Sequence, residues 1–196
     1  TFLVPGLIGM IMMLSAVVAT ALSIVREKER ETMEQLQVSP IRPEELVLGK
    51  TLPYVVIGLV SMALILGLAY LLFGVQVRGS FFLLGFTALL FLFAALGLGV
   101  FISSVTKSQQ VAFQVAILTS LLPSIILSGL IFPISNMPWP IQGLTFVVIP
   151  SYFVAALRGI ILKGAGLAEL WPHLLGLLLL GLVFNLLAAH NTRKAA

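Results

Sequence analysis

Residues 81–105 read FFLLGFTALLFLFAALGLGVFISSV, twenty-five residues without a charged side chain. A helix needs about 20 consecutive apolar residues to cross the hydrocarbon core of a bilayer, so this stretch is long enough to span a membrane. Four other stretches meet the same standard. Because a chain inside lipid must satisfy its own backbone hydrogen bonds, we predict an all-α integral membrane protein. Its spans are expected at residues 2–25, 51–73, 81–105, 111–131 and 172–190.

The composition agrees with a membrane protein. Of the 196 residues, 60% are hydrophobic and 9% are charged, whereas soluble domains carry about 25% charged residues. The net charge of +4 comes from basic residues between long apolar runs, which indicates a topology signal and contact with anionic lipid rather than nucleic acid. No internal repeat or linker divides the sequence, so residues 1–196 are expected to form a single transmembrane domain.

Residues 132–170, between the fourth and fifth expected spans, are harder to assign. Residues 139–162 are apolar enough for a sixth span, but Pro138, Pro140 and Pro150 argue against one continuous helix. We predict two short elements that dip into one leaflet and return, since re-entrant backbone is tolerated where protein or water surrounds it. A kinked sixth span is the alternative.

The basic residues predict the orientation of the spans. With five spans and residues 26–50 inside, eight of the eleven Lys and Arg residues lie in the cytoplasm and three outside, as the positive-inside rule requires. A six-span arrangement gives the same ratio and therefore does not decide the number of spans. The five-span arrangement puts the C-terminus in the cytoplasm and Thr1 outside, from which we expect a further span upstream.

The loop at residues 26–50 holds six of the seven acidic residues of the chain. Pairs such as Arg26–Glu29 have helical spacing and predict a helix, which Pro40 ends. Pro43, followed by two glutamates, is expected to start the next helix. A solvated connector that only sets topology is one interpretation. However, glutamates contribute little to topology, so this mixed charge favours docking to a cytoplasmic protein.

This loop resembles the first cytoplasmic loop of ABC exporter permeases of the type-2 class. The matching residues are REKERETMEQL at 26–36 and RPEELVLGK at 42–50. Two further stretches match the same family, namely LSGLIFPISNMP at 127–138 and IPSYF at 149–153. The resemblance covers nearly the whole chain and implies a multidrug-export-like permease subunit. In that family a first span and an extracytoplasmic domain would precede the residues present.

The resemblance also implies partners and a site. Such a permease pairs with a second permease subunit, identical or different, in a bacterial inner membrane or other plasma membrane. A separate ATPase subunit binds the ATP and Mg and contacts a short coupling helix after the second span of the family. Carried over residue by residue, the resemblance implies that the ATPase-contacting residues are Glu29, Arg30, Glu31, Thr32, Met33, Glu34 and Leu36.

The chain itself shows no pattern expected of a catalytic, metal or cofactor site. Gly49-Lys50-Thr51 resembles the end of a P-loop, but the required first glycine is Glu44. His173 and His190 are far apart and form no His-x-x-x-His pair, so interfacial histidines are the preferred interpretation. The sequence contains no Asp for a Ser-His-Asp triad and no Cys for a disulfide.

The expected spans carry small and weakly polar residues but no buried charge, which favours hydrophobic or amphipathic substrates such as drugs or lipids. Small residues four apart, at 15, 19 and 23 and at 95, 99 and 103, indicate close helix packing, within one subunit or between two. Most of the phenylalanines at 81, 82, 86, 91 and 93 are expected to face lipid. The candidate pathway residues are Thr20, Thr87, Gln114, Thr119, Ser120, Ser124 and Asn185.

Two functions outside the exporter class stay open at this point. One is a membrane scaffold that anchors a cytoplasmic partner without transporting anything. The other is a secondary transporter or channel, which is disfavoured because the spans lack both an intramembrane carboxylate and an inverted repeat.

Overall fold

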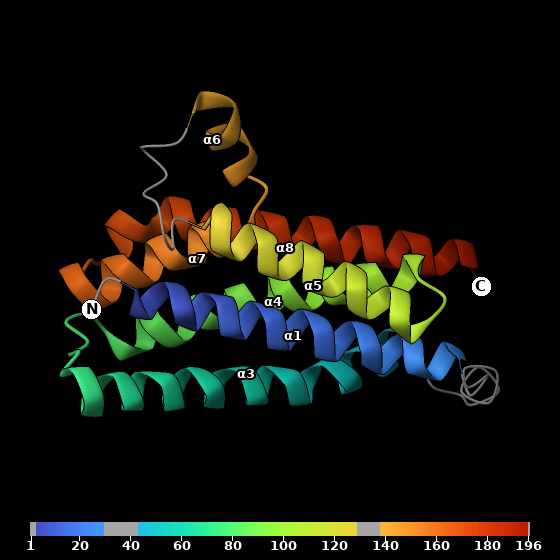
Figure 1. The fold of residues 1–196 in the computed structure, drawn as a ribbon, viewed down its shortest axis with the longest axis horizontal. Coiled ribbons are helices and arrows are strands. Elements are labelled where there is room, and N and C mark those ends of the chain that lie inside the picture. The colour runs from blue at the N-terminus through green and yellow to red at the C-terminus, as the bar shows by residue number, and fades with distance from the viewer. Residues whose placement is uncertain (1–2, 30–42, 129–137, 196) are drawn as a thin grey trace.

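The computed structural model describes residues 3–29, 43–128 and 138–195, of which 43–48, 50 and 192–195 are described by their backbone alone. Every regular element in these ranges is a helix, and five long helices lie side by side along the long axis of the molecule (Figure 1). All five are long and apolar enough to cross a membrane, and a bent helix pair would make a sixth if it formed one span. The five long helices are α1 (Val4–Glu29), α3 (Pro43–Phe73), α4 (Phe81–Val105), α5 (Gln109–Ile126) and α8 (Leu167–Ala195).

The helix ends differ from the predicted spans in ways that the local chemistry explains. Helix α5 begins at Gln109, two residues early, because the Ser108 hydroxyl accepts a hydrogen bond from the Val111 amide and caps the first turn. Helix α8 begins before Pro172 and continues through it, as membrane helices can. Helix α3 starts at Pro43, as predicted, where proline suits the first helical position.

The stretch between α5 and α8 contains a sharply bent pair of helices. Helix α6 (Trp139–Thr145) is followed by α7 (Ile149–Arg158), which continues into a π-helical turn, η2 (Gly159–Lys163). The two parts meet at 87°, so residues 139–162 do not form one straight helix, as the prolines predicted. Pro140 and Pro150 lie in the first turns of α6 and α7, where a missing amide costs little. Helix α6 stands away from the bundle (Figure 1).

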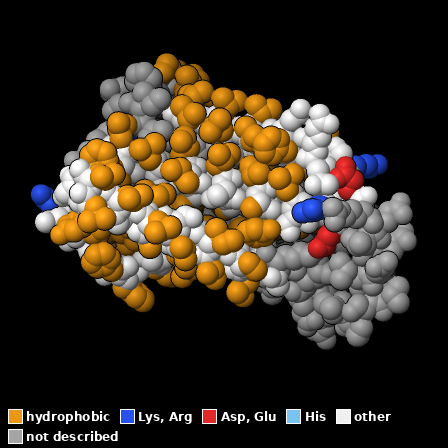
Figure 2. Space-filling model, turned by 60° about the horizontal axis from the view of Figure 1, so that its bottom comes forward, with side chains coloured by type: hydrophobic (Ala, Val, Ile, Leu, Met, Phe, Trp, Pro, Cys, Tyr) orange, Lys and Arg blue, Asp and Glu red, His pale blue; other side chains and the backbone are white. Residues whose placement is uncertain are grey.

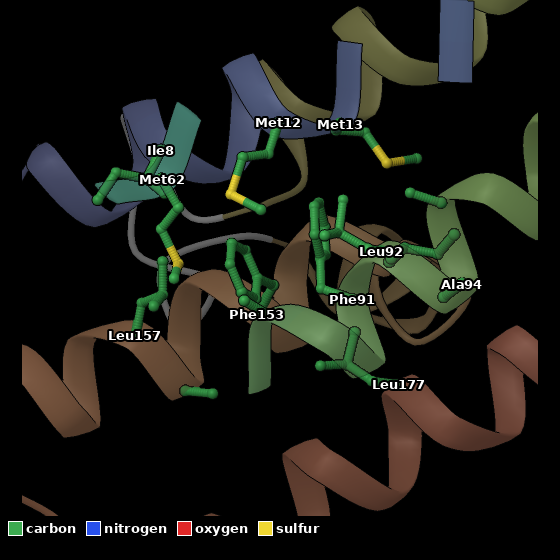
Figure 3. Packing of buried hydrophobic residues seen from close by; sticks show 14 of the residues in the cluster. Ile8, Met12, Met13, Met62, Phe91, Leu92, Ala94, Phe153, Leu157 and Leu177 are labelled. Atoms are coloured by element: carbon green, nitrogen blue, oxygen red, sulfur yellow. The ribbon is translucent and has the colours of Figure 1, made fainter. Parts of the chain in front are cut away.

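Helix α7 is largely buried and contacts α8, α4 and α1. Its Phe153 stacks on Phe91 of α4 with ring centroids 4.0 Å apart, and both side chains are fully buried. Met12 of α1 and Leu177 of α8 belong to the same apolar core (Figure 3). A segment expected to dip into one leaflet therefore contributes buried side chains to the core of the bundle.

Close approach at glycines holds α4 between α1 and α8. A Cβ atom at Gly99 of α4 would lie 2.9 Å from the Cβ atom of Thr20 in α1. A Cβ atom at Gly181 of α8 would lie 2.5 Å from a ring carbon of Phe93 in α4, so only glycine fits there. Residues 95, 99 and 103 are all buried. This small-residue face thus contributes to packing within one chain, one of its two predicted roles.

Candidate coupling end and pathway groove

The end of α1 leads into the segment predicted to contact an ATPase. It lies at the same end of the bundle as the connection between α4 and α5 and the described C-terminal end of α8 (Figure 1). Glu29 is the last residue of α1. The other predicted contact residues lie outside the described residues, and they are Arg30, Glu31, Thr32, Met33, Glu34 and Leu36.

Lys28 connects the end of α1 to the end of α4. Its Nζ atom donates a hydrogen bond to the carbonyl oxygen of Ser103, at 2.5 Å. Ser103 lies in the last turn of α4, where carbonyl groups lack partners within the helix and carry partial negative charge. A lysine at this position both satisfies such a carbonyl and opposes the dipole of α4.

Glu29 makes the matching contact to the start of α5. Its carboxylate accepts a hydrogen bond from the side-chain amide of Gln109, the first residue of α5. A carboxylate near a helix N-terminus is favoured because that end carries partial positive charge. Only residues 106–108 separate α4 from α5. Adjacent residues of α1 thus hold two helix ends of opposite polarity.

The contacts of Lys28 and Glu29 were only partly predictable. Lys28 was assigned to topology, because a lysine at the membrane boundary usually serves that purpose. Its partner is a backbone carbonyl 75 residues away in sequence, and a carbonyl leaves no signal in a sequence. Glu29 was predicted to contact an ATPase, and its contact with Gln109 is compatible with that role without testing it.

A groove opens on the surface beside this end. It has a volume of about 640 Å³ and is lined by α1, by Tyr54 of α3 and by Gln109 of α5. Ala19 and Ser23 of α1 are among its lining residues, as are Arg26 and Glu27 nearer the end of α1. Away from the two ends of the molecule, the visible described side chains on one face are mostly hydrophobic (Figure 2). The groove lies near the charged end of α1 and is lined by both polar and apolar side chains.

Four of the seven candidate pathway residues are buried between helices. Thr20 packs against Gly99, and Thr87 donates its hydroxyl hydrogen bond to the carbonyl of Leu83 at 2.7 Å. Ser120 and Ser124 bond to carbonyls one turn earlier in α5. With Ala112 and Ala116 they form a buried stripe at four-residue spacing on α5, which packs mainly against α1.

The other three candidate residues lie in different places. Gln114 and Thr119 are exposed on α5. Asn185 lies between α8 and α4, where its side-chain amide donates to the carbonyls of Gly181, at 2.8 Å, and Phe93, at 3.3 Å. The structure therefore does not bring the seven residues together in one chain. Of these residues, Gln114 and Thr119 have open surface beside them.

The two histidines are separated along α8, as the sequence indicated. The His173 ring meets the Tyr152 ring edge-on, with centroids 6.4 Å apart, whereas His190 is exposed near the other end of the helix. In the described part of the chain, no group of three or more His, Asp or Glu residues is placed to hold a metal ion.

Comparison with known proteins identifies the family. The model of the ABC-2 family transporter proteins matches residues 1–190. The probable multidrug ABC transporter permease YbhS of Escherichia coli is 40% identical over 163 residues, which cover 83% of this chain and 43% of that protein. The probable multidrug permease YbhR of the same organism is 33% identical over 179 residues, covering 91% of this chain and 48% of the relative.

The similarity extends beyond bacteria. ABC transporter G family member 20 of Dictyostelium discoideum is 30% identical over 202 aligned residues, covering 98% of this chain and 27% of the relative. The chain belongs to the ABC-2 family of transporter proteins and is a multi-pass membrane protein. It spans less than half the length of each of these three relatives.

Proposed function

We propose that the chain is the permease part of an ATP-driven exporter, in which two permease subunits form the pathway and a separate ATPase supplies the energy. The observation that carries this proposal is the last turn of α1. This turn leads directly into the segment predicted to contact the ATPase, and it is bonded to both α4 and α5. The family assignment supports the same function.

The contacts of α1 suggest how motion would pass from the ATPase to the spans. A displacement of residues 30–36 would pull on Lys28 and Glu29 together. Because one of these residues holds α4 and the other holds α5, the connection between the two helices would move with α1. Both hydrogen bonds involve a charged group, and the contact of Lys28, which is partly buried, is the less screened of the two.

The groove beside α1 is the proposed pathway surface of each subunit. Its volume of about 640 Å³ lies in the range typical of small-molecule sites. In a dimer that apposes two such grooves, Ser23 would line the pathway with Gln114 and Thr119 of α5. Their weak polarity among apolar side chains suits hydrophobic or amphipathic compounds such as drugs or lipids. A single groove is open on one side, and a second subunit would close it.

The orientation follows from the charges. We place the end of the bundle with Lys28 and Lys107 in the cytoplasm, in line with the positive-inside rule, and with it the C-terminus. The bent pair α6–α7 then belongs to the outer half of a bacterial inner membrane. Its 87° bend and the prolines in its first turns support a re-entrant pair rather than a sixth span.

Separate variants test docking and transmission. Substituting Glu31 and Met33 is expected to reduce co-purification with the ATPase subunit, since these residues would form the contact. Lys28→Met is expected to leave co-purification unchanged and to lower substrate-stimulated ATP hydrolysis about tenfold, because losing a charged hydrogen bond of roughly 1.5 kcal/mol uncouples α1 from α4. Both quantities are measured on the full complex in lipid nanodiscs.

Lys107→Met is the matched control, because Lys107 is an exposed lysine at the same end of the bundle. If only the loss of one positive charge mattered, the two lysine variants would lower ATP hydrolysis equally. Equal effects would therefore contradict the transmission role of Lys28. Unchanged ATPase binding in the Glu31 and Met33 variants would contradict the docking site. Binding of an ATPase that no candidate substrate stimulates would favour the scaffold function instead.

A further inference from the structure

A second pocket lies between α7 and α8. The end of α7 and the start of α8 lie at the end of the bundle opposite the coupling end (Figure 1). The volume of the pocket is about 480 Å³, and nothing in the proposed transport cycle uses it. Four groups that can carry charge line it, which is unusual in a chain with 9% charged residues. They are Arg158 and Lys163 on the α7–η2 side, and Glu169 and His173 on α8.

The arrangement of charge in this pocket is zwitterionic. Arg158 and Lys163 offer eight N–H donors between them, so both can bind an additional anion while keeping other contacts. Arginine and lysine are the residues that most often bind phosphate. Glu169 adds one negative group, which would repel a second negative charge on a ligand and attract an ammonium group. The matching ligand carries one phosphate and one amine.

Beyond the pocket, α8 exposes apolar side chains on its surface, among them Leu175, Leu179 and Val183. Positions 169, 173, 176, 180 and 183 follow one another at spacings of three and four, so they share one face of the helix. Val183 on this face is about half exposed. It lies about 15 Å deeper than His173 at 1.5 Å per residue, which is the depth of one leaflet. A soluble anion would make no use of this surface, whereas an acyl chain would.

The Tyr152 ring contacts His173, one of the residues that line the pocket. A Cβ atom at Gly176 would lie 2.5 Å from a carbon of this ring, so the ring rests directly on the backbone of α8. The phenolic oxygen donates to the Phe146 carbonyl at 3.0 Å, which keeps the ring in place. The contact of His173 with the same ring orients the imidazole at the boundary between polar and apolar parts.

We propose that this pocket binds the headgroup of an aminophospholipid, with the phosphate held by Arg158 and Lys163 and the ammonium group by Glu169. The acyl chains lie along the apolar face of α8. The lipid contacts both the α7–η2 segment and α8. This binding does not depend on the transport function and would persist if the chain were only a scaffold.

The test is a lipid titration of the purified full chain, followed by native mass spectrometry. Phosphatidylethanolamine, phosphatidylcholine and phosphatidylglycerol with identical acyl chains are compared, with inorganic phosphate as a competitor. Wild type is expected to prefer phosphatidylethanolamine over phosphatidylcholine. Lys163→Gln, an exposed position, is expected to weaken phosphatidylethanolamine binding about tenfold through loss of a charged hydrogen bond. Glu169→Gln is expected to abolish the preference over phosphatidylcholine.

Lys107→Gln removes the same charge at the opposite end and is expected to leave lipid binding unchanged. Circular dichroism confirms that each variant keeps its helix content. Equal lipid affinities of Lys163→Gln and Lys107→Gln would overturn the proposal, as would a preference of the wild type for phosphatidylglycerol. Complete displacement of the lipid by millimolar phosphate would show a site for free anions and would also overturn it.

Discussion

Helices α3 and α4 are both strongly apolar, yet they occupy opposite environments. In the most apolar stretch of α4, 61% of residues are buried in the bundle, against 17% in α3. Helix α4 packs on α8, α1 and α7, whereas α3 contacts mainly α1 and, less extensively, α4. Hydrophobicity alone therefore places a helix in the membrane without saying whether protein or lipid surrounds it.

Both helices contain glycines with and without a neighbouring side chain. In α3 a Cβ atom at Gly58 would lie 2.6 Å from Leu92 of α4, and in α4 the space beside Gly85 is open. Gly97 of α4 receives the side chain of Asn185, and Gly99 receives Thr20. At Gly67 of α3, by contrast, a Cβ atom would have no neighbouring atom within 4 Å. In lipid there is no hydrophobic force between helices, so close approach at small residues is what holds them together. A glycine contributes to packing where a partner side chain enters the space it leaves.

The largest expected effect comes from removing a core side chain of α4. Phe91→Ala should lower the free energy of unfolding by about 3–5 kcal/mol, because it removes the stacking on Phe153 and leaves a cavity. Phe73→Ala in α3, where the ring is 70% exposed, should change it by less than about 0.5 kcal/mol. Reversible unfolding in mixed micelles measures both values, and similar losses would contradict the contrast between the helices.

Filling a glycine should have a smaller effect. Gly97→Leu is expected to cost about 1–3 kcal/mol, because the new side chain must displace Asn185 and push α8 away from α4. Gly67→Leu adds the same atoms to α3 in open space and should be neutral or slightly stabilising, since leucine favours helix over glycine. Equal destabilisation by the two variants would show that glycine content, rather than its partners, determines stability.

The smallest expected effect comes from removing a polar contact between α8 and α4. Asn185→Leu removes the hydrogen bond to the Phe93 carbonyl and should cost about 0.6 kcal/mol, the average for such bonds between membrane helices. Gln114→Leu on the exposed face of α5 is the control and should have no measurable effect on unfolding. A loss above about 2 kcal/mol at Asn185 would mean that polar contacts, rather than packing, keep α4 central.

The class of protein and the positions of its spans follow from the sequence alone. Long uncharged stretches can be stable only as helices in lipid, and their lengths are set by the thickness of the bilayer. The start of α3 at Pro43 and the break within residues 139–162 were predictable for a similar reason, since proline restricts the backbone of its own residue and its neighbour. The resemblance in the charged loop predicted the family that the comparisons show.

Which faces of the helices meet is determined by the tertiary structure. Phe91 was grouped with lipid-facing phenylalanines, yet it is fully buried, because its stacking partner Phe153 comes from α7. Lys28 links α1 to α4 because the carbonyl of Ser103 lies beside its ammonium group. In both cases the partner is far away in sequence. The contact depends on where the fold places that partner and cannot be read from the type of residue. Apolar side chains are equally stable against lipid and protein, so only packing distinguishes the two.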